Sequence, residues 1–260
     1  MPAETSPYTL RLASSASDVL AAKRLRYRVF VRELGATGPL INHTAQTEED
    51  AFDQIADHMI LIDNTADPAQ GDHVIGAYRL LPSDRLPLGQ PFYSEAEFDL
   101  SPLRQSNRRL LELGRSCVHP DHRGGTAMLH LWNGLAAYIL DRNIEILFGT
   151  ASFHGTDTTA LAMPLSWLGH HHLAPPDMRV TARPDHSTPL TQIPAADLDR
   201  SLAMGAMPAL IKAYLRLGGY VGDGAWVDHA FNTIDVCLVM DTARMSAKHR
   251  DFYLRKQGSP

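Results

Sequence analysis

Apolar and polar residues follow each other along the chain in a pattern that predicts a mixed α/β protein. Short apolar runs that alternate with polar residues predict strands, and apolar residues that recur every three or four positions predict helices. The predicted strands cover residues 8–13, 58–62, 73–81, 110–118, 144–149, 178–182 and 231–240. The predicted helices cover residues 19–34, 126–141, 157–168 and 206–217.

Capping and turn residues set the ends of these elements. Ser17 and Asp18 predict the N-cap of the first helix, Gly35 ends it, and Gly218 ends the last one. Residues 35–57 and 82–102 predict long irregular segments, and long loops within a compact domain tend to be functional. The proline-rich stretch that begins at residue 174 is interpreted as part of an insertion extending to about residue 205.

Length and composition predict one globular domain over residues 1–260, ending in a basic tail. Hydrophobic residues make up 44% of the chain and charged residues 20%, which is typical of a packed core and not of a disordered chain. No apolar run reaches the roughly 18–20 residues that cross a bilayer, and the N-terminus does not resemble a signal peptide. We therefore expect a cytoplasmic protein, in which Cys117 and Cys237 are buried and reduced.

The net charge of −5 gives no reason to expect a nucleic-acid partner. Basic residues nevertheless gather in two segments, one between residues 23 and 32 and one between residues 104 and 123. For the first, a solvated helix face and a functional surface are equally good interpretations. The basic tail and the amphipathic helix at 206–217 leave peripheral contact with the inner membrane open, although a packed helix with a solvated tail is the favoured interpretation.

The most informative segment runs from Leu110 to Gly125, where a predicted strand ends in a turn that opens a helix. Gly124 and Gly125 allow the backbone to approach a ligand closely, and the free N–H groups of the first helical turn point at an anion. Arg123 adds charge-assisted hydrogen bonds to a phosphate, next to the backbone of Val118. The strand, the turn and the helix together resemble motif A of the GNAT acyltransferases.

The turn departs from the usual GNAT pattern, because His122, Gly125 and Ala127 occupy the positions expected for its three key residues. This departure favours a donor with a single phosphate over coenzyme A. The phosphopantetheine thioester of acyl carrier protein is such a donor, so we expect acyl carrier protein as a partner and no permanently bound cofactor. Arg104, Arg108, Arg109 and Arg123 are the candidate docking residues for this acidic carrier.

Further motifs narrow the resemblance. Arg26-x-x-x-Phe30, Glu49-Asp50-x-x-Asp53, Arg79, and Glu112-x-x-Arg115 follow each other in the order seen in acyl-homoserine-lactone synthases. Together with Arg28-Val29-Phe30 and the Asp228-to-Asp235 segment, they are more similar to ornithine N-acyltransferases of ornithine-lipid biosynthesis, over about residues 8–240.

The resemblance implies a GNAT-like α/β fold with a central mixed, mostly antiparallel sheet flanked by helices. It also implies transfer of a 3-hydroxyacyl group from acyl carrier protein to the α-amine of ornithine, yielding a lyso-ornithine lipid. Three alternatives stay open. They are the same reaction on glutamine or another amino acid, an acyl-homoserine-lactone synthase, and a non-catalytic module that binds an acyl carrier.

Such a reaction needs a base, because an amino-acid amine is mostly protonated at neutral pH. Glu112 is the candidate, since a carboxylate within an apolar strand is costly unless it is used. The alternative is a structural ion pair with Arg115 or Arg79. Backbone N–H groups near Ser116 and Cys117 are the candidates for polarising the thioester carbonyl. Because no nucleophile-elbow turn surrounds Ser116, we expect direct attack by the amine.

Carboxylates and arginines supply the candidate amino-acid site. Asp50 and Asp53 suit cationic amino groups, and Arg79 or Arg115 suits a carboxylate. Arg26 and Phe30 share one helix face and are expected to order the loop that carries the aspartates. The three consecutive histidines at 170–172 cannot all face one ion, so we predict no metal site.

Overall fold

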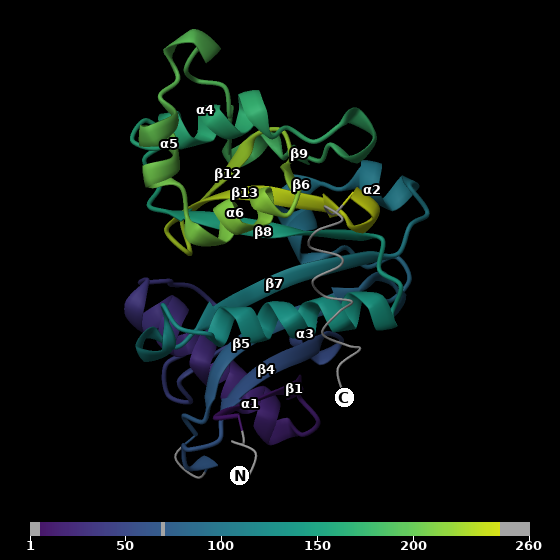
Figure 1. Cartoon of the computed structure of the whole chain (residues 1–260), viewed down its shortest axis with the longest axis vertical. Helices are drawn as coiled ribbons and strands as arrows, with labels where there is room; N and C mark the ends of the chain where they lie inside the picture. Colours follow the sequence, from purple (N-terminus) through teal and green to yellow (C-terminus); the bar gives the residue numbers. More distant parts are fainter. Residues whose placement is uncertain (1–5, 69–70, 245–260) are drawn as a thin grey trace, which may run out of the picture. The chain divides into compact units, whose positions relative to one another are not determined.

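The computed structural model describes residues 6–68 and 71–244, and its contacts divide the chain into two compact units. Unit 1 comprises residues 1–81 and 113–142, and unit 2 comprises residues 82–112 and 143–260. The chain passes between the units within strand β7 (Leu110–Val118), after Glu112. The elements of both units are labelled in Figure 1. The single domain expected for residues 1–260 stays a prediction.

Unit 1 contains a sheet whose strands follow the order β1, β4, β5 and β7. Strand β4 (Asp57–Asp63) pairs antiparallel with β1 (Tyr8–Leu12) and with β5 (Val74–Pro82). Helix α3 (Ala127–Asp141) packs against β1 and β4 (Figure 1). Gly134 allows this approach, because a Cβ there would collide with the side chain of Leu10.

Helix α1 (Ala16–Arg26) continues as a π-helical segment η1 (Tyr27–Glu33) and forms one wall of the core of unit 1. The predicted N-cap at Ser17 and Asp18 is wrong, because the hydroxyl of Ser15 accepts the N–H of Asp18. Asp18 instead pairs with Arg11 of β1. Ser15 and Asp18 are both good capping residues. Because Asp18 pairs with Arg11 of β1, Ser15 is the one that caps the helix.

Residues 35–57, predicted as irregular, contain short regular elements. They are strands β2 (Ile41–Asn42) and β3 (Thr47–Glu48), which pair antiparallel, and the 3₁₀ helix η2 (Ala51–Gln54). Asp50 caps η2 and Asp53 closes a reciprocal capping box with it. Elements of two to four residues give too short a periodicity to be recognised in sequence.

Unit 2 contains a second run of paired strands in the order β7, β8, β13, β12 and β10, with β11 also pairing with β13. Strands β7 and β8 (Ile146–His154) run parallel, through Leu110–Glu112 of β7. The remaining strands pair antiparallel and are β10 (Ser187–Thr188), β11 (Tyr220–Val221), β12 (Ala225–Asp228) and β13 (Thr233–Asp241). Strand β8 extends five residues beyond its predicted end because β13 pairs with its whole length.

The helices of unit 2 start later than predicted or were missed. They are α2 (Ser101–Gln105), α4 (Ala162–His171), α5 (Arg200–Ala206) and α6 (Ala209–Arg216). Asp157 accepts N–H groups from a turn before α4, not from the helix itself. Pro208 supplies the N-cap position of α6, so the amphipathic segment is divided between α5 and α6.

The insertion is tied into unit 2 by short strands. The strand predicted for residues 178–182 shrinks to β9 (Thr181–Ala182), because Pro176–Met178 forms a 3₁₀ turn before it. Strand β9 pairs with β6 (Phe98–Asp99), and β10 pairs with β12. The remaining 3₁₀ helices are η4 (Ser83–Arg85), η5 (Tyr93–Ala96), η6 (Pro120–His122), η8 (Pro184–His186), η9 (Ala195–Asp197) and η10 (Thr242–Arg244).

The predicted fold class is confirmed, since both units combine largely antiparallel strands with flanking helices. Over residues 6–68 and 71–244, no helix has both the length and the apolar character needed to cross a membrane. Of the predicted basic tail, only Arg244 lies within the described residues.

Candidate active site

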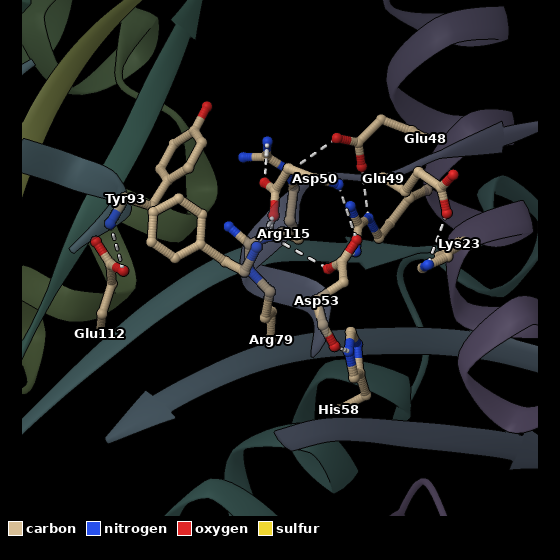
Figure 2. A network of polar contacts seen from close by, with 12 residues as sticks. Lys23, Glu48, Glu49, Asp50, Asp53, His58, Arg79, Tyr93, Glu112 and Arg115 are labelled. Atoms are coloured by element: carbon tan, nitrogen blue, oxygen red, sulfur yellow. Dashed lines mark hydrogen bonds and ion pairs between the residues drawn. The ribbon is translucent and has the colours of Figure 1, made fainter. Parts of the chain in front are cut away.

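Glu112, the candidate base, is the last residue of β7 that pairs with β8, in register with Phe148. Its side chain is buried, and its two carboxylate oxygens accept the backbone N–H groups of Tyr93 at 3.0 Å and Ser94 at 2.7 Å. Figure 2 shows the contact with Tyr93, at the start of η5. These two backbone donors orient the carboxylate.

The turn after β7 has the open backbone expected of an anion cradle. Gly124 has φ of 77°, and a Cβ built on Gly124 or Gly125 meets no atom of the described residues within 4 Å. Helix α3 begins after Thr126 without a side-chain cap. The first N–H groups of α3 are thus directed at whatever binds in front of the helix, which is the arrangement that suits a phosphate.

Two contacts fix this turn to η1. Arg123 forms a bidentate pair with Glu33 at 2.5 and 2.6 Å and donates to the carbonyl of Val118 at 3.1 Å. Arg28 donates to Nε2 of His119. The guanidinium of Arg123, predicted to bind a phosphate, is engaged by the carboxylate of Glu33 in this structure.

The predicted amino-acid-binding residues of unit 1 pair with one another in a three-arginine cluster, which comprises Arg26, Arg79, Arg115, Glu48, Asp50 and Asp53 (Figure 2). Arg26 pairs with Glu48 at 2.5 Å and with Asp53 at 2.6 Å, and its side chain is 1% exposed. The cluster carries three positive and three negative formal charges. It holds the loop of residues 35–57 on helix α1, as expected for Arg26.

The remaining pairs close the three-arginine cluster. Arg79 contacts Asp50 at 2.5 Å and Asp53 at 3.2 Å, and Arg115 contacts Glu48 and Asp50, each at 3.1 Å. Burial by itself would raise the pKa of Asp53, but Arg26 and Arg79 outweigh it and hold that pKa below its ordinary value.

Two neighbours complete the surroundings of this cluster. The ring of His58 donates to the carbonyl of Asp53 at 3.0 Å, and burial lowers the pKa of His58. Phe30, the partner of Arg26 in the sequence motif, is partly buried against the apolar core of unit 1.

Arg115 departs from ordinary strand geometry within β7. Its φ of 51° lies in the left-handed region, which is uncommon for any residue other than glycine. Gly114, Arg115 and Ser116 are all half-buried, so the usual alternation of buried and exposed positions is interrupted there. Strained backbone of this kind concentrates at functional sites, and it adjoins the N–H groups proposed to polarise the thioester.

The two cysteines are not placed as nucleophiles. Cys117 packs with Ala21, Leu25 and Ile60 in the core of unit 1, and burial raises its pKa to about 12. Burial also raises the pKa of Cys237 in unit 2. A protonated, enclosed thiol is a poor nucleophile, which agrees with direct attack by the amine.

The arginines predicted as a docking face are largely matched by carboxylates. Arg104 pairs with Glu95 at 2.5 Å, and Arg108 pairs with Asp241 at 2.7 Å. By contrast, three arginines of α1 and η1 at intervals of four residues, Arg24, Arg28 and Arg32, line a pocket of about 360 Å³. Of these, Arg28 also pairs with Asp72. The pocket lies on the N-terminal basic segment, and Arg26 of the same segment is buried apart from it.

The consecutive histidines make ordinary structural contacts. Nε2 of His170 contacts the carbonyl of Ile193, and His171 stacks on Trp167 with ring centroids 4.0 Å apart.

Unit 2 also contains a group of carboxylates to which the sequence analysis assigned no role. Glu97, Asp228 and Asp235, here called the acidic cluster, each bring a carboxylate oxygen within 4.8 Å of the others. Glu97 lies in a segment predicted as irregular, and it is separated from Asp228 by more than one hundred residues of sequence. Asp228 and Asp235 meet because β12 pairs with β13, and Glu97, which directly precedes β6, joins them through the tertiary fold.

The chain is similar to known acyltransferases over nearly its whole length. Residues 25–133 match the model of an acetyltransferase (GNAT) domain. The L-ornithine N(alpha)-acyltransferase of Rhodobacter capsulatus is 59% identical over 98% of this chain and 98% of that protein. Its counterpart in Brucella abortus is 39% identical over 94% of this chain and 88% of that protein.

Solved structures show the same fold. The CoA-dependent acyl-homoserine lactone synthase BjaI, solved with MTA, matches 97% of this chain and 90% of its own, with a TM-score of 0.54 and 16% identity.

Proposed function

Because the chain belongs to the family of L-ornithine N(alpha)-acyltransferases, we propose that it transfers a 3-hydroxyacyl group from a thioester to the α-amine of ornithine. The product is an amide, a lyso-ornithine lipid. The observation that carries this proposal is the 59% identity over almost all of both chains, which leaves no large part of the R. capsulatus enzyme unmatched.

The chemistry follows from the amine and the thioester. The α-ammonium loses a proton to Glu112, the free amine attacks the thioester carbonyl carbon, and a tetrahedral oxyanion forms. Collapse of this intermediate breaks the C–S bond and completes the C–N bond. The leaving thiolate takes the proton that Glu112 holds, and the nitrogen releases its second surplus proton to solvent as it becomes the amide N–H. Backbone N–H groups near Ser116 and Cys117 stabilise the oxyanion, while the turn at Gly124 and Gly125 binds the phosphate of the donor.

Acyl carrier protein is the proposed donor. The degenerate turn suits a single phosphate, and the pocket lined by Arg24, Arg28 and Arg32 suits an acidic carrier, because opposite charges steer the encounter of the two proteins. This places the docking surface at the N-terminal arginines instead of at Arg104 and Arg108, whose charges are matched by Glu95 and Asp241.

The cytoplasm is the proposed location, since the thioester donor and the free amino acid are both found there. Peripheral contact with the inner membrane remains the alternative. Helix α6 buries Ile211 and Tyr214, so part of its apolar face is already used within unit 2.

The test is lipid mass spectrometry in a bacterial host that lacks aminolipids, with labelled ornithine or labelled glutamine supplied. We expect labelled lyso-ornithine lipid, and turnover by purified protein with 3-hydroxyacyl carrier protein but much less with the matching coenzyme A ester. Glu112→Gln should reduce turnover roughly 100- to 10,000-fold, since it removes the base. Glu49→Gln is the matched control, because Glu49 pairs with Lys23 at the surface and its side chain is half exposed.

Each rival predicts a different outcome. Labelled acyl-glutamine would show that the acceptor is glutamine and not ornithine. Acylation of S-adenosylmethionine would identify an acyl-homoserine-lactone synthase. Carrier binding without any acylated product would indicate a binding module. Wild-type turnover by Glu112→Gln would remove Glu112 as the base while leaving the acyltransferase intact.

A further inference from the structure

The acidic cluster lies on the face of the unit 2 sheet that also holds Glu112. Asp228 is directly opposite Thr233, and Asp235 follows Thr233 by two positions, so all three side chains point to one face. Val239 lies on the same face of β13, four positions after Asp235, and pairs with Phe148 of β8. Phe148 pairs in turn with Glu112 of β7. The candidate base and the acidic cluster therefore share one side of the sheet.

The electrostatics of a neighbouring thiol agree with this geometry. Cys237 is on the same face of β13, between Asp235 and Val239. Burial raises the pKa of Cys237, and the negative charges of Glu112 and Glu97 raise it further. One thiol on this face thus feels the charge of the candidate base and of Glu97 of the acidic cluster.

Thr233 supplies a second, independent observation. Its side chain is 9% exposed, and its hydroxyl has no hydrogen-bond partner among the residues that the structure describes. The hydroxyl is on the same face as the carboxylates, opposite Asp228. Leaving a buried hydroxyl without a partner is costly, so its position beside the acidic cluster points to a ligand that hydrogen-bonds there.

The neighbouring groups indicate what kind of ligand fits. Trp226 is directly opposite Asp235 in the register, so its side chain is on the same face as the acidic cluster. Asp228 is held in place by the N–H groups of Ala230 and Phe231, at 2.7 and 3.0 Å. Carboxylates, a hydroxyl and an aromatic ring together suit an organic ammonium group, which offers three N–H donors and one positive charge.

We propose that the acidic cluster binds the side-chain ammonium of the acceptor amino acid and so selects a basic amino acid over a neutral one. The inference deepens the acyltransferase function proposed above and rests on it. With the side-chain ammonium held by Glu97, Asp228 and Asp235, the α-amine of the same molecule is directed along the face towards Glu112. Asp50 and Asp53, paired with arginines in unit 1, are then not needed for the amino groups.

The test compares ornithine with norvaline, which has the same carbon chain but no terminal amine. Purified full-length protein is given 3-hydroxyacyl carrier protein and either acceptor. We expect Asp235→Asn to raise the KM for ornithine roughly 30-fold or more, since it removes one partner of an enclosed charge pair. The KM for norvaline should stay the same or fall, and kcat should change little. Glu97→Gln should act in the same direction.

The matched control is Asp177→Asn, an exposed aspartate of unit 2, which should leave both KM values unchanged. Equal rises of KM for ornithine and norvaline in Asp235→Asn would assign the residue a structural role and overturn the proposal. So would unchanged selectivity. Activity that is lost with EDTA, together with binding of Mg²⁺ or Ca²⁺ that Asp235→Asn abolishes, would assign the acidic cluster to a metal ion instead.

Binding separates this inference from the proposed function. Titration calorimetry should detect ornithine binding to the wild-type protein and its loss in Asp235→Asn, whether or not the protein is an acyltransferase. If the wild type acylates no amino acid yet binds ornithine through Asp235, the proposed function fails and the ammonium site stands. If the wild type acylates ornithine and Asp235→Asn keeps its selectivity, the ammonium site fails alone.

Discussion

The two units contain charged clusters of opposite design. In the three-arginine cluster of unit 1, each carboxylate contacts an arginine within 3.2 Å, and the formal charges balance. In the acidic cluster of unit 2, three carboxylates gather within 4.8 Å of one another, and all carry the same sign of charge. Asp228 and Asp235 belong to a segment that the sequence motifs single out, whereas Glu97 belongs to none of these motifs.

The difference indicates how each group is used. A balanced, buried cluster satisfies its own charges, and its contribution is to fix a loop to a helix. A group of like charges is stabilised when a cation enters, so its free energy depends on a ligand. Carboxylates suited to a cationic substrate are present in both units. Those of unit 1 are paired with arginines, and those of unit 2 carry charges of one sign beside the hydroxyl of Thr233, which supports the ammonium site proposed above.

The largest expected effect comes from breaking the balanced cluster. Arg26→Ala removes the partner of Glu48 and Asp53, whose side chains are 0% and 1% exposed. Because two carboxylates would remain buried, we expect the free energy of unfolding to fall by about 3–5 kcal/mol, measured by urea denaturation.

The matched control for this change is Lys23→Ala, three residues earlier on the same helix. Lys23 pairs with Glu49, whose side chain is 50% exposed, so the loss should stay below about 1 kcal/mol. Similar losses for both variants would contradict the view that burial sets the importance of these pairs.

A smaller effect is expected from acid. Since the pKa of Asp53 in the folded protein lies below its unfolded value, Asp53 contributes stability that is present above about pH 4 and is lost as pH falls below it. The urea midpoint should therefore decrease between pH 6 and pH 3. The decrease should be weaker in Arg26→Ala and unchanged in Lys23→Ala. An equal decrease in the wild type and both variants would show that Asp53 is not the cause of the acid sensitivity.

The smallest effect is expected at the thiols, which report on the two clusters separately. Burial raises the pKa of both, while Cys117 feels Arg26 and Glu48 with opposite signs and Cys237 feels two carboxylates of one sign. Neither thiol should react with a chromogenic disulfide at pH 8 in the native protein, and both should react in urea. Rapid native labelling of Cys117, identified by mass spectrometry, would contradict its place in the core.

Local pattern predicted much of the backbone. Strand β7 was predicted with its observed ends, and α3 within one residue, because nine alternating or apolar residues and a four-turn apolar stripe are strong signals. The turn at Gly124 and Gly125 was predicted for the same reason, since its glycines, proline and arginine are adjacent in sequence. Short elements such as β3 and η2 were missed because their stability comes from ion pairs with α1.

What the sequence alone determined is the local chemistry, namely which segments form strands and helices, and which residue types stand at Glu112, Asp50 and Arg79. What only the tertiary structure decided is which of these side chains meet. It paired Asp50 and Asp53 with arginines, gave Glu112 two backbone donors, and brought Glu97 to Asp228 and Asp235. The physical reason is that charge pairing depends on distance in space, and residues far apart in sequence become neighbours only through sheet register and chain return.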